Sequence, residues 1–201
     1  MKGNLEIINL PEKILMLLNW TNHNTKVAIL NVYIPALTTN NQTKTENKII
    51  EHLVTLQTND YQTIIAGDLN DYEDFHLDRW STYNRQSQHN AGFTRKLTHK
   101  NMIDTFRTEH PTKKSFSCWE TYTDKTEGKT YHTRTRIDAI RIPSERRDWI
   151  QRAEVLEYYE IDSDHRIVLA DLSIPIKTKQ INQSVTMKPE THHKTTEEER
   201  K

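Results

Sequence analysis

The sequence has a single cysteine, no long apolar run and no net charge. Cys118 has no second cysteine to pair with, which excludes a disulfide framework and favours a reducing intracellular compartment. The longest apolar run, residues 14–18, is far too short to cross a bilayer, so no membrane partner is expected. The polar opening of residues 1–4 lacks the apolar stretch of a secretory signal. We therefore expect an intracellular protein, with the nucleus among the candidate compartments.

The net charge of zero conceals an uneven distribution of charged side chains. Residues 41–78 carry two basic and eight acidic side chains, whereas residues 79–152 carry sixteen basic and eight acidic ones. A basic segment can follow a phosphate backbone while an acidic one holds a metal ion. Two solvated faces of opposite sign explain the same numbers, and on charge alone that plainer interpretation is favoured.

The apolar pattern predicts one mixed α/β domain over residues 1–176. Two apolar runs, residues 13–20 and 26–34, flank a short polar stretch and predict a strand hairpin. Residues 43–57 have the one-sided apolar stripe of a helix, with Thr43 and Glu46 as its capping box. Three further strands and one further helix are predicted, at residues 63–66, 137–142 and 167–174 and at residues 94–101. The sheet is expected to be largely antiparallel.

Residues 177–201 contain almost no apolar side chains and end in Glu-Glu-Glu-Arg-Lys. Such a segment cannot bury enough surface to offset the entropy lost on ordering. We predict a disordered tail or linker there.

Four short motifs place polar and titratable side chains at the ends of predicted strands, where a rigid scaffold can hold them. They are Asn-Val-Tyr-Ile-Pro (31–35), Gly-Asp-Leu-Asn (67–70), Arg-Ile-Asp (136–138) and Ser-Asp-His (163–165). Taken singly, each has a structural explanation, such as an ordinary turn at Gly67 or half-buried packing of Tyr33. Their occurrence together and in this order indicates a functional site.

The order of these motifs resembles that of the endonuclease/exonuclease/phosphatase superfamily, which has the DNase I-like fold. Its members carry N-x-Y-x-P, G-D-x-N, R-x-D and S-D-H segments in the same order. The stretch from Asp104 to Trp119 also resembles the D-x-x-R, H-P and F-T-W segments of many members. The resemblance covers residues 13–174 and is greatest to the endonuclease domains of LINE-type retrotransposons. It implies a four-layer α/β sandwich of two packed, largely antiparallel sheets flanked by helices.

The resemblance also implies hydrolysis of a phosphodiester in nucleic acid, with DNA as the expected partner. Asp68 would orient and deprotonate the attacking water, and Asn70 would hold that water or a phosphoryl oxygen. His165 would contact the scissile phosphate, with Asp138 fixing the tautomer of its imidazole. Tyr33 would donate a hydrogen bond to the phosphate.

The metal implied by the resemblance is Mg²⁺ or Mn²⁺, held by Asp164 and Asp68. Carboxylate oxygens suit these hard cations, and no Cys/His cluster in the sequence suggests zinc. Superfamily members also carry an Asn-bearing strand and a metal-binding Glu ahead of the N-x-Y-x-P strand, and the surroundings of Glu6 and Glu12 do not resemble that Glu segment. We therefore expect about 80–100 residues of the fold to be absent, with weaker metal binding and exposed strand edges as a result.

Three functions remain open on the sequence alone. The first is a magnesium-dependent endonuclease, and the second is an inactive remnant that binds at most nucleic acid or a protein. The third is a phosphatase or phospholipase of the same fold. Inositol-polyphosphate phosphatases carry a P-x-W-C-D-R-I segment that residues 131–138 do not match, and the basic balance of residues 79–152 favours nucleic acid. Oligomeric state and a preference for DNA over RNA do not follow from the sequence.

Overall fold

The computed structural model describes residues 4–10, 15–22, 25–36, 39–83, 92–156 and 162–175, with side chains for 25–36, 42–83, 92–156 and 162–175. Its centre is a six-stranded sheet with the order β1-β2-β3-β4-β9-β6. These strands are β1 (Asn4–Leu10), β2 (Leu15–Asn22), β3 (Thr25–Tyr33), β4 (Tyr61–Asp68), β6 (Met102–Asp104) and β9 (Asp138–Pro143). The predicted tail at residues 177–201 and the start of the first predicted strand, at residues 13–14, lie outside the described residues.

The predicted strand hairpin is confirmed, because β2 and β3 pair antiparallel from Leu15↔Val32 to Asn22↔Thr25. β1, which the sequence pattern did not predict, continues the sheet by pairing antiparallel with β2. Among the described strand pairs, β3 and β4 are the parallel one. A parallel pair needs a crossover connection, and helix α1 (Thr39–Thr58) provides it.

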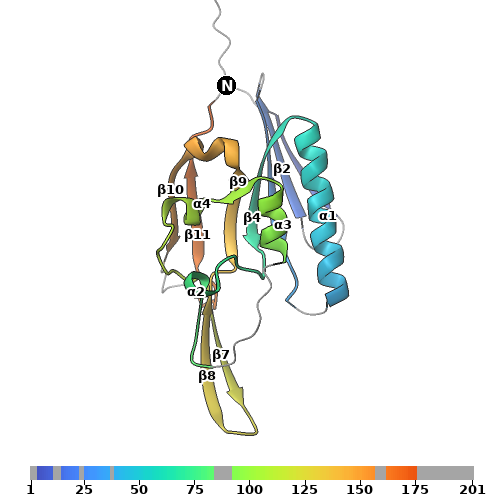
Figure 1. Cartoon of the computed structure of the whole chain (residues 1–201). Helices are drawn as coiled ribbons and strands as arrows, with labels where there is room; N and C mark the ends of the chain where they lie inside the picture. Colours follow the sequence, from blue (N-terminus) through green and yellow to red (C-terminus); the bar gives the residue numbers. More distant parts are fainter. Residues whose placement is uncertain are drawn as a thin grey trace, which may run out of the picture.

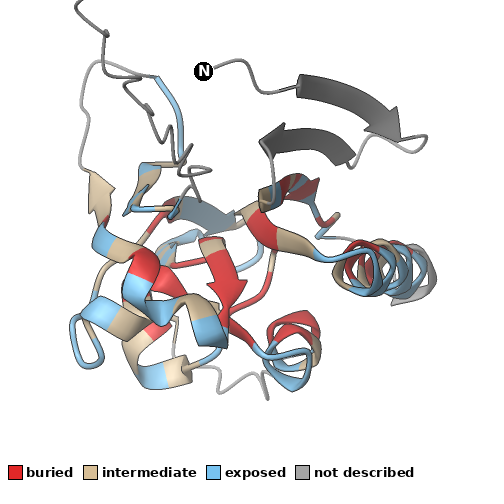
Figure 2. Ribbon diagram, turned by 90° about the horizontal axis from the view of Figure 1, so that it is seen from above, coloured by how far each residue is buried: buried red, intermediate tan, exposed pale blue. Residues whose placement is uncertain are grey.

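Helices α1 and α3 (Phe93–His99) cover one face of this sheet (Figure 1). Leu30 of β3 and Ile65 of β4 are fully buried there against Ile49, Leu53 and Leu97 of the helices. Figure 2 shows that the buried residues lie where helices and strands face one another. The helix predicted at residues 94–101 is confirmed by α3. None of the helices in the described part of the chain is long and apolar enough to span a membrane.

The capping box predicted at Thr43 and Glu46 is wrong. Helix α1 begins at Thr39, so Thr43 lies inside the helix rather than at its N-terminus. The carboxylate of Glu46 accepts a hydrogen bond from Lys96 Nζ at 2.8 Å instead, which ties α1 to α3. The apolar stripe predicted the helix, but the polar residues ahead of it extend the same helix by one turn.

The other face of the six-stranded sheet packs against a two-stranded sheet. Strands β10 (Ile150–Leu156) and β11 (Ile167–Leu172) pair antiparallel. Val27, Ile64 and Ile142 of the large sheet form a buried cluster to which Ile150 and Leu172 contribute. The described residues thus show helices, sheet and second sheet stacked in order, and nearly all of their strand pairs are antiparallel as predicted.

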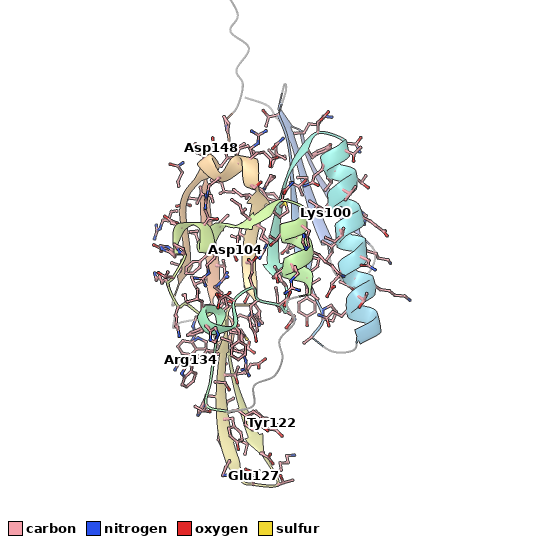
Figure 3. The ribbon with its side chains drawn as sticks, viewed as in Figure 1. Lys100, Asp104, Tyr122, Glu127, Arg134 and Asp148 are labelled. Carbon is pink, nitrogen blue, oxygen red and sulfur yellow. The ribbon has the colours of Figure 1, made fainter. Side chains whose placement is uncertain are left out.

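A third, three-stranded sheet projects from the body of the domain. It has the order β5-β8-β7, with bounds Arg79–Ser81, Lys129–Thr135 and Cys118–Asp124. Its long hairpin carries Tyr122 and Glu127 far from the core, with Arg134 nearer its base (Figure 3). Tyr122 is 64% exposed, so this hairpin holds its shape through strand pairing rather than burial.

A buried ion-pair network anchors the start of β9. Arg136 is 3% exposed and donates from Nε to Asp78 Oδ1 at 2.8 Å and from Nη1 to Asp104 Oδ2 at 2.7 Å. Arg107, in the short helix α4 (Thr105–Glu109), also pairs with Asp78, the last residue of α2 (Phe75–Asp78). The arginines of the R-x-D and D-x-x-R segments therefore meet in one structural cluster, directly beside Asp138.

Candidate functional site

Three of the predicted site residues form a row across neighbouring strands. Tyr33 ends β3 and is the register partner of Asp68, which ends β4. Asp68 is in turn the register partner of Asp138, the first residue of β9. Residues directly opposite one another in a sheet project from the same face. By strand alternation this is the face that carries Ile64 and packs on β10 and β11.

His165 reaches this row from the second sheet. It lies two residues ahead of β11, and its Nδ1 is 2.9 Å from Asp138 Oδ2. The prediction that these two side chains lie within hydrogen-bond reach is confirmed. The backbone N–H of His165 donates to Ser163 Oγ at 3.0 Å, so the Ser-Asp-His segment also fixes its own turn.

Asn70 holds Asp68 in place through hydrogen bonds from its backbone and its side-chain amide. Its backbone N–H donates to Asp68 Oδ1 at 2.9 Å. Its side-chain Nδ2 donates to Ile34 O at 2.5 Å and to Asp68 Oδ2 at 3.3 Å. The φ of 43° at Asn70 is a left-handed conformation that asparagine tolerates better than most residues. The sequence predicted that this amide would hold water or a phosphoryl oxygen, whereas its geometry points to positioning Asp68.

Ser117 is a site residue that the motif pattern did not single out. Its side chain is fully buried, and its Oγ accepts hydrogen bonds from the backbone N–H groups of Ile137 and Asp138 at 3.1 and 3.0 Å. These bonds fix the backbone that presents Asp138. The available signal was the hydroxyl residue in Phe-Ser-Cys-Trp, at the place of Thr in the superfamily's F-T-W segment.

The electrostatics of the site act on both Asp68 and His165. Burial raises the pKa of Asp68, and the nearby carboxylates of Asp138 and Asp164 raise it further, against the hydrogen bond from Asn70. Burial opposes the charged imidazolium of His165, but the Asp138 carboxylate outweighs it and raises the pKa of His165. Asp68 is thus a stronger base than a free aspartate, and His165 retains its proton to higher pH.

Asp138→Asn should lower the pKa of His165, measured by the NMR chemical shifts of its ring protons against pH. The sign follows from the interaction: Asp138 stabilises the protonated ring, so its contribution to folding is full below the unfolded-state pKa of histidine. That contribution is lost as pH rises through the raised folded-state pKa. The ring-proton chemical shifts of the exposed His99 are the control and should be the same in both proteins. An unchanged His165 titration in Asp138→Asn would contradict the pairing.

Asp68, Asp138 and His165 offer ligand atoms within 4.8 Å of one another, and so do Cys118, Asp164 and His165. The carboxylates of Asp68, Asp138 and Asp164 suit a hard divalent cation. Burial, followed by the carboxylates of Asp138 and Asp164, raises the pKa of Asp68, and a bound cation would neutralise the charge of those carboxylates. The donor set therefore fits Mg²⁺ or Mn²⁺, although Asp164 falls in the second group rather than beside Asp68.

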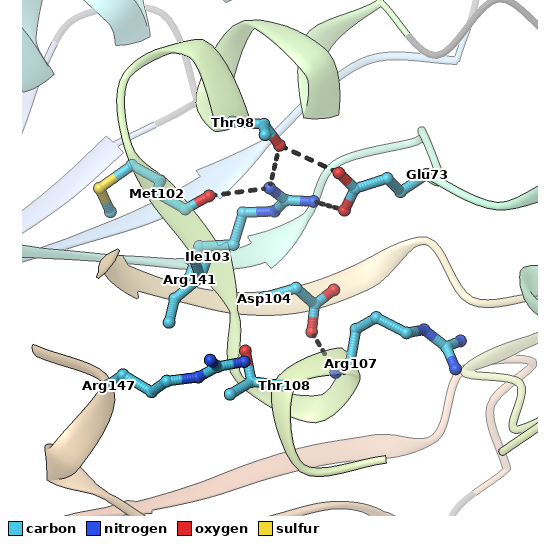
Figure 4. A pocket seen from close by; sticks show the side chains of 9 residues that line it. All are labelled: Glu73, Thr98, Met102, Ile103, Asp104, Arg107, Thr108, Arg141 and Arg147. Carbon is cyan, nitrogen blue, oxygen red and sulfur yellow. Dashed lines mark hydrogen bonds and ion pairs between the residues drawn. The ribbon is translucent and has the colours of Figure 1, made fainter. Parts of the chain in front are cut away.

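A pocket of about 230 Å³ lies elsewhere, between α3, β6, α4 and the 3-10 helix η1 (Ser144–Trp149) (Figure 4). Its buried Arg141 donates to Glu73 Oε2 at 3.0 Å and to Thr98 Oγ1 and Met102 O at 3.2 Å each. Asp104, which also lines it, accepts from Arg107 N at 3.1 Å and from Arg136. These contacts pair most of the polar groups that line the pocket, while Nε of Arg107 and Nε of Arg141 are buried without a hydrogen-bond partner among the described residues. We assign no ligand to this pocket.

No protein-family model matches the sequence, and no curated protein is significantly similar to it. Solved structures do match. The AP endonuclease of Leishmania major is 16% identical with a TM-score of 0.64, over 82% of this chain and 56% of that one. A 3′ phosphatase, NExo from Neisseria, bound to a product DNA hairpin, is 16% identical with a TM-score of 0.60, over 86% and 70%. The endonuclease domain of TRAS1, a telomere-specific non-LTR retrotransposon, is 12% identical with a TM-score of 0.55, over 85% and 69%.

The chain thus spans 56% to 70% of the length of these three solved chains. Identities this low establish the fold alone, and the fold agrees with the one implied by the motif order. The chain has the DNase I-like fold.

Proposed function

We propose that this domain hydrolyses phosphodiester bonds of DNA as an endonuclease, assisted by a divalent cation. The observation that carries the proposal is the Asp138–His165 pair, 2.9 Å apart, beside the partly buried Asp68. Three segments distant in sequence would have no structural need to gather these charges at the end of the packed sheets. Clustered groups with perturbed pKa values are typical of catalytic sites.

Asp68 serves as the general base in this proposal. The pKa of Asp68 is raised toward neutral pH, so its carboxylate accepts a proton from water more readily than a free aspartate does. The two hydrogen bonds from Asn70 keep the carboxylate fixed toward the reacting water. A preoriented base lowers the entropy cost of the attack.

His165 supplies positive charge and a hydrogen bond to the phosphate. Because Asp138 accepts from Nδ1, the other ring nitrogen, Nε2, is the one directed to a phosphoryl oxygen. Tyr33 is 50% exposed at the end of β3, so its hydroxyl is accessible to a bound strand. Together these donors would stabilise the charge that develops on the phosphoryl oxygens.

The cation is assigned to Asp68 and Asp164, with Mg²⁺ or Mn²⁺ as the ion. When bound, it supplies positive charge that neutralises the phosphoryl group and the leaving oxygen. DNA is favoured as substrate because the named neighbours include an AP endonuclease, a retrotransposon endonuclease domain and a phosphatase bound to product DNA. The excess of basic side chains over residues 79–152 agrees with a polyanionic substrate.

Nicking of supercoiled plasmid DNA with Mg²⁺ tests the proposal. Since the chain spans 56% to 70% of the neighbours' length, the assay uses this chain and also a chimera with a neighbour's N-terminal segment joined ahead of β1. Asp68→Asn and His165→Ala should each lower nicking by about 10²-fold or more. Asp162→Asn, which removes an exposed carboxylate near the site, should leave it unchanged.

Nicking that persists in both Asp68→Asn and His165→Ala would reject this site. DNA binding without nicking, by chain and chimera alike, would favour the inactive binding module instead. Loss of nicking without loss of DNA affinity in the two variants separates a catalytic role from simple substrate binding.

A further inference from the structure

Cys118 lies beside the site but has no place in the proposed hydrolysis. It is the single cysteine of the chain, 1% exposed, and the first residue of β7. It forms an antiparallel bridge with His165. Trp119 N donates to Asp164 O at 2.9 Å, and Arg166 N donates to Ser117 O at 2.7 Å. These bonds fix the register on both sides, so Cys118 and His165 project from the same face.

Three kinds of ligand atom therefore meet at one point. Cys118 Sγ, a carboxylate oxygen of Asp164 and a ring nitrogen of His165 all lie within 4.8 Å of one another. In a tetrahedral zinc site with bonds of about 2.0–2.3 Å, neighbouring ligand atoms are about 3.3–3.8 Å apart. The ligand atoms therefore have to approach one another by at most about 1.5 Å. Rotation of the exposed Asp164 side chain and of the His165 ring can supply this movement.

Asp138 completes the arrangement from outside. It accepts from His165 Nδ1 at 2.9 Å, so a cation bound to this ring would take the other nitrogen, Nε2. A carboxylate that holds the far nitrogen of a metal-bound histidine is a recurring feature of zinc sites and orients the ring.

We propose that Cys118, Asp164 and His165 form a binding site for a borderline-soft divalent cation such as Zn²⁺. A thiolate and an imidazole select such a cation over Mg²⁺, which prefers oxygen ligands. Three protein ligands leave the fourth tetrahedral position to water. As the sulfur–metal bond forms, the thiol proton is released to solvent.

A nucleophilic or redox role suits Cys118 less well. Burial, followed by the nearby acidic side chains, raises the pKa of Cys118 to about 12, so the free thiol stays protonated and unreactive. A bound dication would neutralise the nearby carboxylates and so lower the pKa of the Cys118 thiol. The cysteine is thus inert toward electrophiles and available to a metal.

The consequence for activity rests on the proposed function. A cation bound to His165 removes the nitrogen assigned to the phosphate, so Zn²⁺ should inhibit nicking in the presence of Mg²⁺. The site itself stands on the geometry alone and is tested without any substrate.

Titration of the purified chain with Cd²⁺ provides that test, because cadmium–thiolate bonds absorb in the ultraviolet and Cys118 is the one thiol present. We expect a band that saturates at one Cd²⁺ per chain, is displaced by Zn²⁺ and persists in excess Mg²⁺, which competes for Asp164 but not for the thiolate. Cys118→Ser should abolish the band. Asp164→Asn and His165→Ala should each weaken Cd²⁺ affinity by about tenfold or more, whereas Asp162→Asn and His99→Ala should not.

A chain that shows no saturable band overturns the proposal. So does a band whose affinity is the same in Asp164→Asn and His165→Ala as in the parent, because the thiol would then bind cadmium without its neighbours. Asp164 is exposed, so its variant stays informative if Cys118→Ser fails to fold. Saturable binding without any nicking activity in either the parent or the chimera would leave the site standing while rejecting the proposed hydrolysis.

Discussion

Arg136→Met is expected to destabilise the fold by about 3–5 kcal/mol. Arg136 is the shared partner of two buried carboxylates, Asp78 and Asp104, which are 0% and 5% exposed. Methionine preserves much of the side-chain volume but donates no hydrogen bond. Asp104 would lose its ion-pair partner, and Asp78 would keep its ion pair with Arg107 and the hydrogen bond from Asp74 N. An uncompensated buried charge costs far more than the net contribution of an intact pair.

Thermal unfolding followed by circular dichroism measures this effect. A loss of 3–5 kcal/mol corresponds to a fall in Tm of roughly 6–20 °C for a chain of this size. Arg134→Met is the matched control, because Arg134 is exposed two residues earlier and contacts the rings of Trp80 and Trp119. Loss of those contacts should cost about 1 kcal/mol or less. Equal Tm values for the two variants would show that the buried network contributes little.

The R-x-D segment therefore combines two separate requirements. Arg136 neutralises buried acids from α2 and β6, while Asp138, two residues on, faces His165. A resemblance to family motifs predicts both residues but does not distinguish the structural one from the candidate catalytic one. Burial distinguishes them, because the side chain of Arg136 is 2% exposed and that of Asp138 is 18% exposed.

Local patterns in the sequence predicted most of the elements that surround the site. The β2–β3 hairpin, β4, α3, β9 and β11 each carry a run or stripe of apolar residues long enough to identify them. β1 was missed because its short sequence mixes polar and apolar residues, and its strand conformation depends on pairing with β2. Helix α1 was predicted one turn too short because its first turn is polar and carries no apolar stripe.

The convergence of the four motifs followed from a family resemblance, not from local pattern. Contacts that only the fold creates could not be predicted in this way. Ser117 accepts a hydrogen bond from the backbone N–H of Asp138, which is 21 residues away in the sequence. Cys118 forms a bridge with His165, which is 47 residues away. The sequence contains no Cys/His spacing typical of zinc, because Cys118 opens β7 whereas Asp164 and His165 lie just ahead of β11, and the two segments meet through a single bridge.

Gly67→Ala is expected to destabilise the fold by more than about 4 kcal/mol. Gly67 has a φ of 135°, which residues with a side chain rarely adopt. A Cβ there would also lie 2.0 Å from the carbonyl oxygen of Val32 on the neighbouring strand. Since that contact is with backbone, β3 and β4 would have to separate where Tyr33 faces Asp68. We expect Tm to fall by at least about 8 °C.

Gly128→Ala separates the two causes. Gly128 has a φ of 64°, and nothing lies within 4 Å of the position its Cβ would take. That variant therefore carries the conformational penalty alone, about 1 kcal/mol. A Gly67→Ala protein no less stable than Gly128→Ala would show that β3 and β4 do not approach as closely as described. If the approach is as close as the structure shows, glycine is the one residue that keeps Asp68 in register with Tyr33 and Asp138, which is the arrangement the proposed hydrolysis needs.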